Sequence, residues 1–152
     1  MTRVVLDTNI LLRLSVPEHP TRAVVADAVD WLHQNGQKPV LLPQIVYEFW
    51  AVATRMVAAN GLGKTPDDAD SLIDQFTRRF PVKRDERKVC HHWQAIARKY
   101  RVTGVNSHDM RIVAAMLRHG IPSLLTTNPR DFQRYAEIEV LTPEAVPPRF
   151  PG

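Results

Sequence analysis

The sequence predicts an α/β fold in which helices cover a mostly parallel β-sheet. Short β-branched and aliphatic runs alternate along the chain with segments whose apolar residues recur at helical spacing, a pattern typical of parallel sheets. The chain has 152 residues, of which 44% are hydrophobic and 24% charged, as is ordinary for one globular domain. We therefore expect a single domain over residues 1–143, followed by a proline-rich tail over 144–152 that forms an extended, mobile arm.

The first expected strand runs from Arg3 to Leu6 and reads RVVL. Its three apolar residues follow one another without alternation, which is typical of a strand buried on both faces in the middle of a parallel sheet. The further strands are expected at 39–42, 80–83, 122–127 and 138–143.

Helices are expected between these strands. In the segment 21–33, Val25, Val29 and Leu32 recur at three- and four-residue spacings, which indicates an amphipathic helix. Another helix is expected after Thr65, which has the side chain of an N-cap and is followed by a proline and two aspartates. The remaining helices are expected at 44–59, 85–100 and 107–119.

Several classes of protein are excluded by the pattern of charges and cysteines. Asp7, Glu48 or Asp109 interrupts each long nonpolar stretch before the roughly 18 residues that a membrane helix needs. The first residues also lack the order of a signal peptide, so we expect a cytoplasmic protein with no membrane partner. Cys90 is the sole cysteine, which excludes an internal disulfide and a cysteine zinc cluster, and we expect it to be a small core residue.

The positive charge of the chain is concentrated in one region. The net charge is +4, and nine basic residues against two acidic ones lie between Arg78 and Arg101. Such a region attracts a polyanion such as RNA, but a solvated helix face has the same composition, and charge alone does not separate the two. Trp50 and Trp93 could stack on bases, although packing in the core is the more common role of such residues.

Polar side chains follow the first strand and interrupt the inward faces of two helices. Asp7 comes directly after the first strand, where ligands bind in parallel sheets, although it could simply cap the next helix. Glu48 lies within the apolar stripe of its helix and must find a partner there, either Arg55 or a bound ion. Asp109 shares the inward face of its helix and could also complete a capping box with Asn106.

A fourth polar stretch, TTNPRDF, follows a later strand and offers Asn128 and Asp131 as oxygen donors or turn residues. In an alternating α/β chain all four pieces converge at one edge of the sheet. Several carboxylates placed together repel one another, and a divalent cation removes that conflict. Oxygen donors suit Mg²⁺ or Mn²⁺, so the sequence predicts a site for one of these ions.

The stretches LDTNILL, YEFWAVATR, HDMRIVAAM and LLTTNPRDF resemble, in this order, the motifs of PIN-domain nucleases, and the size of the chain is similar to that of VapC-type toxins of toxin–antitoxin pairs. The resemblance covers residues 3 to about 143. It implies a Rossmann-like three-layer α/β/α sandwich with a mostly parallel sheet, and metal-dependent hydrolysis of RNA. It further implies a homodimer and an antitoxin protein whose basic side chain enters the acidic site.

The resemblance also assigns roles to residues of this chain. Asp7, Glu48 and Asp109 would be the three core acids that hold Mg²⁺ or Mn²⁺. Asn128 stands at a position where the family has aspartate or asparagine, while Asp131 belongs to the motif ending DF, so either could complete the site. Thr8 matches the hydroxyl residue after the first acid and would hold water or phosphate.

Two other functions compete with nuclease activity as explanations of these residues. Phosphatases of the haloacid dehalogenase type need a second aspartate two residues after the first, and this chain has Asn9 there. A catalytically silent PIN fold that binds RNA or protein is the alternative that remains, and loss of a core acid would be its mark. None of the three core acids is lost in this sequence.

Overall fold

A parallel four-stranded sheet forms the centre of the protein in the computed structural model, which describes residues 2–104 and 107–146. The strand order is β2-β1-β3-β4, so the first strand lies inside the sheet with a neighbour on each side. Val4 pairs with Pro39 of β2 on one side and with Ser123 of β3 on the other. The strands are β1 (Thr2–Leu6), β2 (Gln37–Val40), β3 (Ser123–Leu125) and β4 (Glu139–Leu141).

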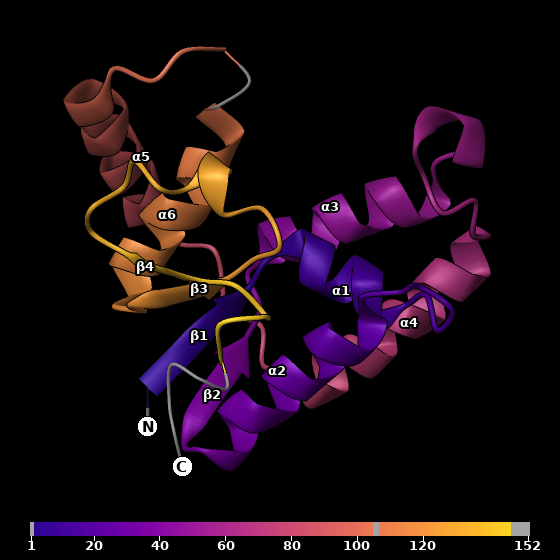
Figure 1. Ribbon diagram of the computed structural model, residues 1–152. Helices are drawn as coiled ribbons and strands as arrows, with labels where there is room; N and C mark the ends of the chain where they lie inside the picture. The colour runs from indigo at the N-terminus through magenta and orange to yellow at the C-terminus, as the bar shows by residue number, and fades with distance from the viewer. Residues whose placement is uncertain (1, 105–106, 147–152) are drawn as a thin grey trace.

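Helices pack on the two faces of the sheet, which gives the three-layer α/β/α arrangement that the sequence predicts. Figure 1 shows α5 and α6 together on one side of the strands, and α1 to α4 on the other. The α-helices are α1 (Thr8–Leu14), α2 (Arg22–Gln34), α3 (Pro43–Thr54), α4 (Pro66–Arg79), α5 (Arg87–Tyr100) and α6 (Ser107–His119). Two short 3₁₀ helices, η1 (Val57–Ala59) and η3 (Pro129–Asp131), follow α3 and β3. Among the described residues, no helix combines the length and the apolar character that crossing a bilayer requires.

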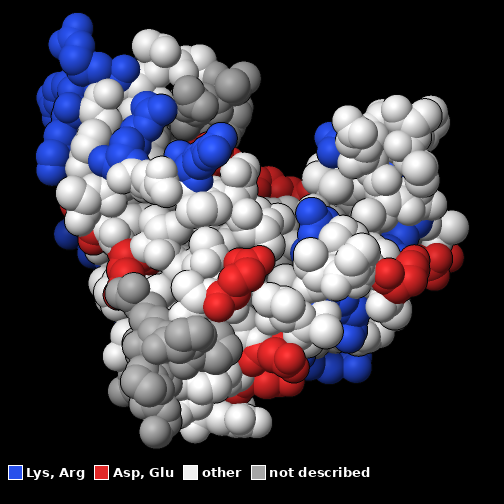
Figure 2. All heavy atoms as spheres, viewed as in Figure 1, with Lys and Arg blue, Asp and Glu red and all other residues white. Residues whose placement is uncertain are grey.

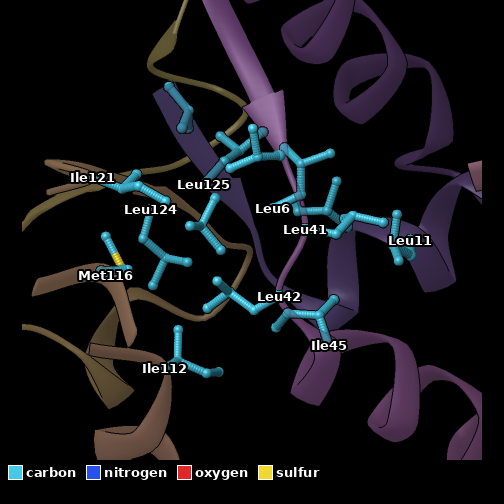
Figure 3. Packing of buried hydrophobic residues seen from close by; sticks show 14 of the residues in the cluster. Leu6, Leu11, Leu41, Leu42, Ile45, Ile112, Met116, Ile121, Leu124 and Leu125 are labelled. Carbon is cyan, nitrogen blue, oxygen red and sulfur yellow. The ribbon is translucent and has the colours of Figure 1, made fainter. Parts of the chain in front are cut away.

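The hydrophobic core lies between the sheet and its helices (Figure 3). Val4, Val5 and Leu6 of β1 are completely buried, which confirms the expectation of a central strand covered on both faces. Burial of each such side chain contributes roughly 1.5–3 kcal/mol to folding. Leu124 and Leu125 of β3 are equally buried, so the two central strands anchor the segments that follow their carboxyl ends.

One expected strand is replaced by a single bridge. The sequence predicts a strand over 80–83, but the structure pairs only Leu41 with Val82, through hydrogen bonds of 2.8 Å from Leu41 N–H to the Pro81 oxygen and from Lys83 N–H to the Leu41 oxygen. The pairing stops there because the chain turns into α3 at Pro43. The sheet therefore ends at β2, and the prediction of a further strand was wrong.

The helix expected over 44–59 is interrupted. It ends at Thr54, because the following loop folds back and its N–H groups cap the last carbonyl oxygens of α3. Leu62 N–H donates to Val52 at 3.0 Å, and Gly63 N–H donates to Arg55 at 2.8 Å. The loop comes so close that a Cβ placed on Gly61 would lie 2.0 Å from the Arg55 carbonyl oxygen. Only glycine fits this approach, so Gly61 fixes the end of the helix.

Three side chains lie differently from their expected places. Cys90 is exposed on α5 instead of packed in the core, because Val89 and Ile96 form the buried side of that helix. Trp50 is 38% exposed on α3, whereas Trp93 packs against the core. Val146, inside the stretch expected to be a tail, is completely buried, and residues 147–152 of that stretch lie outside the described residues.

We predict that Gly61→Ala destabilises the protein by about 1–3 kcal/mol, because the added methyl group pushes the loop off the end of α3. Thermal unfolding measures the effect. Gly36→Ala is the control. No atom lies within 4 Å of a Cβ at this position, so the positive φ is the only source of strain for an alanine there. If Gly61→Ala unfolds at the same temperature as Gly36→Ala or at a higher one, the role of Gly61 in fixing the end of α3 is wrong.

Candidate metal and acid site

The candidate site begins where the central strand ends. Asp7 follows β1 directly, and its backbone N–H donates to the Leu125 carbonyl oxygen at 2.9 Å. Its Oδ1 accepts a hydrogen bond of 2.8 Å from the Thr8 backbone N–H, so the side chain also caps α1. Asp7 therefore combines both roles that the sequence suggests for it: it caps α1, and it lies at the carboxyl edge of the sheet. The side chain is buried, which places a carboxylate inside the edge where parallel sheets bind ligands.

A second carboxylate reaches the same place from α3. Glu48 is half-buried, and its Oε2 accepts a hydrogen bond of 2.7 Å from the Thr8 hydroxyl. Its Oε1 accepts a second one, also 2.7 Å, from Gln44, one helical turn earlier. No ion pair joins Glu48 to Arg55 in the part of the chain that is described. Packing of α3 on α1 thus brings the two acids together with Thr8 between them.

Two polar residues that the sequence analysis did not assign to the site support Asp7. The hydroxyl of Thr126, which is completely buried just after β3, donates to Asp7 Oδ2 at 2.7 Å. The Asn9 amide lies 3.3 Å from the same oxygen, and its carbonyl oxygen accepts from Thr127 N–H at 3.0 Å. Thr126 could have been found from its place at the end of a predicted strand, since the neighbouring strand is followed by Asp7.

Asn128 and Asp131 lie in the segment that follows Thr126. Asn128 N–H donates to the Thr126 hydroxyl at 3.0 Å, and the Asn128 amide donates to Asp131 Oδ2 at 2.7 Å. Both side chains therefore act together at the exposed rim, with Asp131 as the acceptor. The negative charge of Asp131 contributes to the raised pKa of Asp7.

Asp109 is the third residue of α6 and is half-buried. Burial is the main cause of the raised pKa of Tyr135, and the negative charge of Asp109 raises it further. The proposed cap residue Asn106 lies outside the described residues. The structure thus links four of the predicted residues, Asp7, Thr8, Glu48 and Asp131, by hydrogen bonds or charge, while the charge of Asp109 acts on Tyr135.

Burial raises the pKa of the Asp7 carboxyl above its ordinary value, and the negative charges of Glu48 and Asp131 raise it further. Hydrogen bonds from Thr126 and Thr8 oppose this rise but do not cancel it. The folded protein therefore holds a carboxylate whose ionised form is unfavourable. A neighbouring positive charge would remove that cost.

The donor chemistry of the site suits a hard divalent cation, because the groups bonded to one another there are carboxylates, hydroxyls and an amide, with no thiolate or imidazole among them. Within the described ranges, however, no three Asp, Glu, His or Cys side chains converge as a metal-binding group. The oxygens of Asp7 and Glu48 are instead bonded to hydroxyl and amide groups. The residues fit a cation by their chemistry, with the two acids as its main ligands.

The charged side chains divide the surface into two parts. Figure 2 shows Lys and Arg gathered over the projection that carries α5, and Asp and Glu at the bottom of the notch between this projection and the one formed by α3. Several basic residues of 78–101 are paired, as in the bridges of Arg79 to Asp30 at 2.7 Å and of Lys99 to Glu137 at 3.4 Å. The region is still basic overall and stands beside the acidic floor.

The backbone is similar to that of several toxin–antitoxin proteins. VapBC2 from Rickettsia felis, bound to a DNA fragment from its promoter, has a TM-score of 0.70 and 14% identity, covering 93% of this chain and 98% of that one. VapBC-1 from nontypeable Haemophilus influenzae gives a TM-score of 0.70 and 20% identity over the same shares. Mycobacterium tuberculosis VapC20, a sarcin-ricin loop cleaving toxin, gives 0.60 and 13% over 90% and 98%.

The sequence comparison leads to the same fold. None of the curated proteins with which the sequence was compared matches it. The model of the PIN domain family does match, over residues 4–138, and this range includes β1, the acid pair and the segment around Asn128. The chain therefore belongs to the PIN domain family.

Proposed function

We propose that this PIN domain is the toxin of a cytoplasmic toxin–antitoxin pair and that it hydrolyses phosphodiester bonds of RNA with Mg²⁺ or Mn²⁺. The observation that carries the proposal is that Thr8 bonds to both acids at the carboxyl edge of the sheet, through its backbone N–H to Asp7 and through its hydroxyl to Glu48. Neighbours with this fold include a toxin that cleaves the sarcin-ricin loop, which favours RNA as the substrate. A silent PIN fold is disfavoured because the acids have been kept.

In this proposal Asp7 and Glu48 hold the cation, with Asp109, Asn128 and Asp131 as further oxygen donors. Bound there, the cation would supply Lewis-acid chemistry for the attack of water on phosphorus. Thr8 orients Glu48 by donating to it, and Thr126 orients Asp7 in the same way. The basic side chains over α5 would hold the RNA backbone without reading its sequence.

We predict that RNA cleavage requires a divalent cation and both acids. Asp7→Asn and Glu48→Gln should each lower the rate at least about a hundredfold, since loss of even an outer partner of a metal ligand costs up to that much. Gel analysis of a labelled RNA with Mg²⁺ or Mn²⁺ measures the rate. Glu18→Gln, which neutralises an exposed acid remote from the site, is the matched control. Cleavage that survives a chelator or the Asp7→Asn change contradicts the mechanism.

A second prediction concerns the stability of the protein and needs no measurement of catalysis. Because the pKa of Asp7 is raised in the folded state, folding favours its protonated form, and stability falls as the pH rises from the unfolded pKa through the folded one. At neutral pH without metal, Asp7→Asn should therefore raise the unfolding temperature, by about 2–4 °C for each kcal/mol gained. The gain should vanish in acid, where Asp7 is protonated.

Thermal unfolding in a chelator, repeated from acid to neutral pH, tests this second prediction. Asp7→Ala is the control, because it leaves the Thr8 N–H and the Thr126 hydroxyl without their acceptor and should lower stability. Adding Mg²⁺ should stabilise the wild type and leave Asp7→Asn unchanged. A fall in stability on Asp7→Asn, or equal stabilisation of both proteins by the ion, would show that Asp7 is not a strained metal ligand.

An apolar strip on α3 and η1 supports a protein partner. Tyr47, Trp50, Met56 and Val57 are 60%, 38%, 69% and 72% exposed, which is unusual for large apolar side chains that lie along one projection. We propose that an antitoxin covers this strip and that the toxin itself is a homodimer. Similar structures from Rickettsia felis and Haemophilus influenzae are VapBC proteins, which favours such a partner.

We predict that the product of a small reading frame beside the gene binds the chain and inhibits cleavage, and that Trp50→Asp weakens the complex at least tenfold. Calorimetry gives the affinity. Sedimentation of the isolated chain should give twice its mass of 17.3 kDa. Trp93→Phe, on the other projection, is the control. Unchanged binding by Trp50→Asp would exclude the strip as the contact.

A further inference from the structure

Two adjoining pockets lie at the start of α5, against α6. One has a volume of about 400 Å³ and the other about 350 Å³, and Asp85, Glu86 and Arg87 line both. Ligand sites of proteins have volumes of about 300–1,000 Å³, so the two together are large enough for a ligand with two distinct parts. Neither pocket is lined by Asp7 or Glu48, so they are separate from the acid pair.

The first pocket has an apolar wall beside its charged side chains. Val89 and Trp93, one helical turn apart on α5, line it together with Cys90. Asp85 and Arg111 also line it and are joined by an ion pair of 3.2 Å, so the pocket that holds the indole ring also offers an acceptor and several donors. A flat heteroaromatic ring matches this lining, because it can stack on tryptophan and form hydrogen bonds at its edge.

The second pocket is cationic. Arg84, Arg87, Lys88 and Arg118 line it, and its acids are Asp85 and Glu86. With Arg111 of the first pocket, five cations face two acids, and the side chain of Arg84 is 86% exposed. The N-terminal end of a 14-residue helix adds partial positive charge at the same place. This half therefore suits a phosphate group.

We propose that the two pockets form one binding site for a nucleotide unit, with the base against Trp93 and the phosphate between Arg84, Arg87 and Lys88. The apolar half distinguishes this ligand from an acidic peptide, which would use the cationic half alone. The unit can be a free nucleotide or one residue of an RNA strand, because the chemistry is the same. The site concerns binding only and does not depend on cleavage at Asp7.

Cys90 provides a direct test, since it is the sole cysteine of the chain and lines the first pocket. Alkylation by iodoacetamide, followed by intact mass in the presence of a chelator, should slow when adenosine 5′-monophosphate is added. Ribose 5-phosphate, which lacks the base, should protect Cys90 much less. A short 2′-O-methyl oligoribonucleotide forms the third arm, and stronger protection by it than by the mononucleotide identifies an RNA strand as the source.

Two variants and two controls complete the experiment. Trp93→Leu should weaken adenosine monophosphate binding at least about fivefold, the lower limit for loss of a base stack, and Trp93→Phe should restore most of it. Lys88→Glu, at an exposed position that does not affect folding, should weaken binding several-fold. Arg98→Ala, on the same helix but lining a different pocket, and Trp50→Leu on α3 should not change it. Thermal unfolding verifies that each variant is folded.

The proposal is overturned by any of three results. Equal protection by ribose 5-phosphate and adenosine monophosphate would show that the base is not bound. Equal weakening by Arg98→Ala and Lys88→Glu would show diffuse attraction of anions. Equal protection by tetraglutamate would assign the surface to an acidic peptide. Because all measurements are made without metal, loss of nuclease activity in the chain would leave these outcomes unaffected.

Discussion

The structure depends on the burial of one carboxylate at the end of its central strand. Asp7 is held there by backbone pairing to Leu125 and by hydrogen bonds from Thr8 and Thr126, so strands β1 and β3 and helix α1 all meet at its side chain. A buried charge is costly, and these donors offset only part of that cost. The fold thus keeps a strained group at its sheet edge, as is common where strain serves function.

The positions of the two projections follow from this arrangement. Helix α3 packs on α1 and brings Glu48 to Thr8, and the loop around Gly61 closes the far end of the same helix. Helix α5 packs along α6 on the other side and carries the basic side chains. The acidic residues at the bottom of the notch and the basic residues on α5 therefore belong to different layers. The sheet between these layers sets the distance between the two groups of residues.

The sequence was sufficient for the parts of the protein that depend on local patterns. The central strand, the Thr65 cap and the place of Asp7 followed from apolar runs and capping residues, and the structure confirms them. The end of α3 could not be predicted, because a backbone contact between Gly61 and Arg55 determines it. The roles of Thr126 and Gln44 also required the structure, since hydroxyl and amide residues match many environments. The exposure of Cys90 also required the structure, because residue type alone does not show that Val89, and not Cys90, lies on the buried side of α5.

The burial of Val146 affects how the chain can be shortened or fused. Its side chain is completely buried in the core, although composition placed the domain boundary before it. A truncation after residue 143 would open a cavity beside the sheet, at a cost on the order of 2–5 kcal/mol for an aliphatic side chain of this kind. Purification tags and reporter fusions should accordingly be joined downstream of this valine.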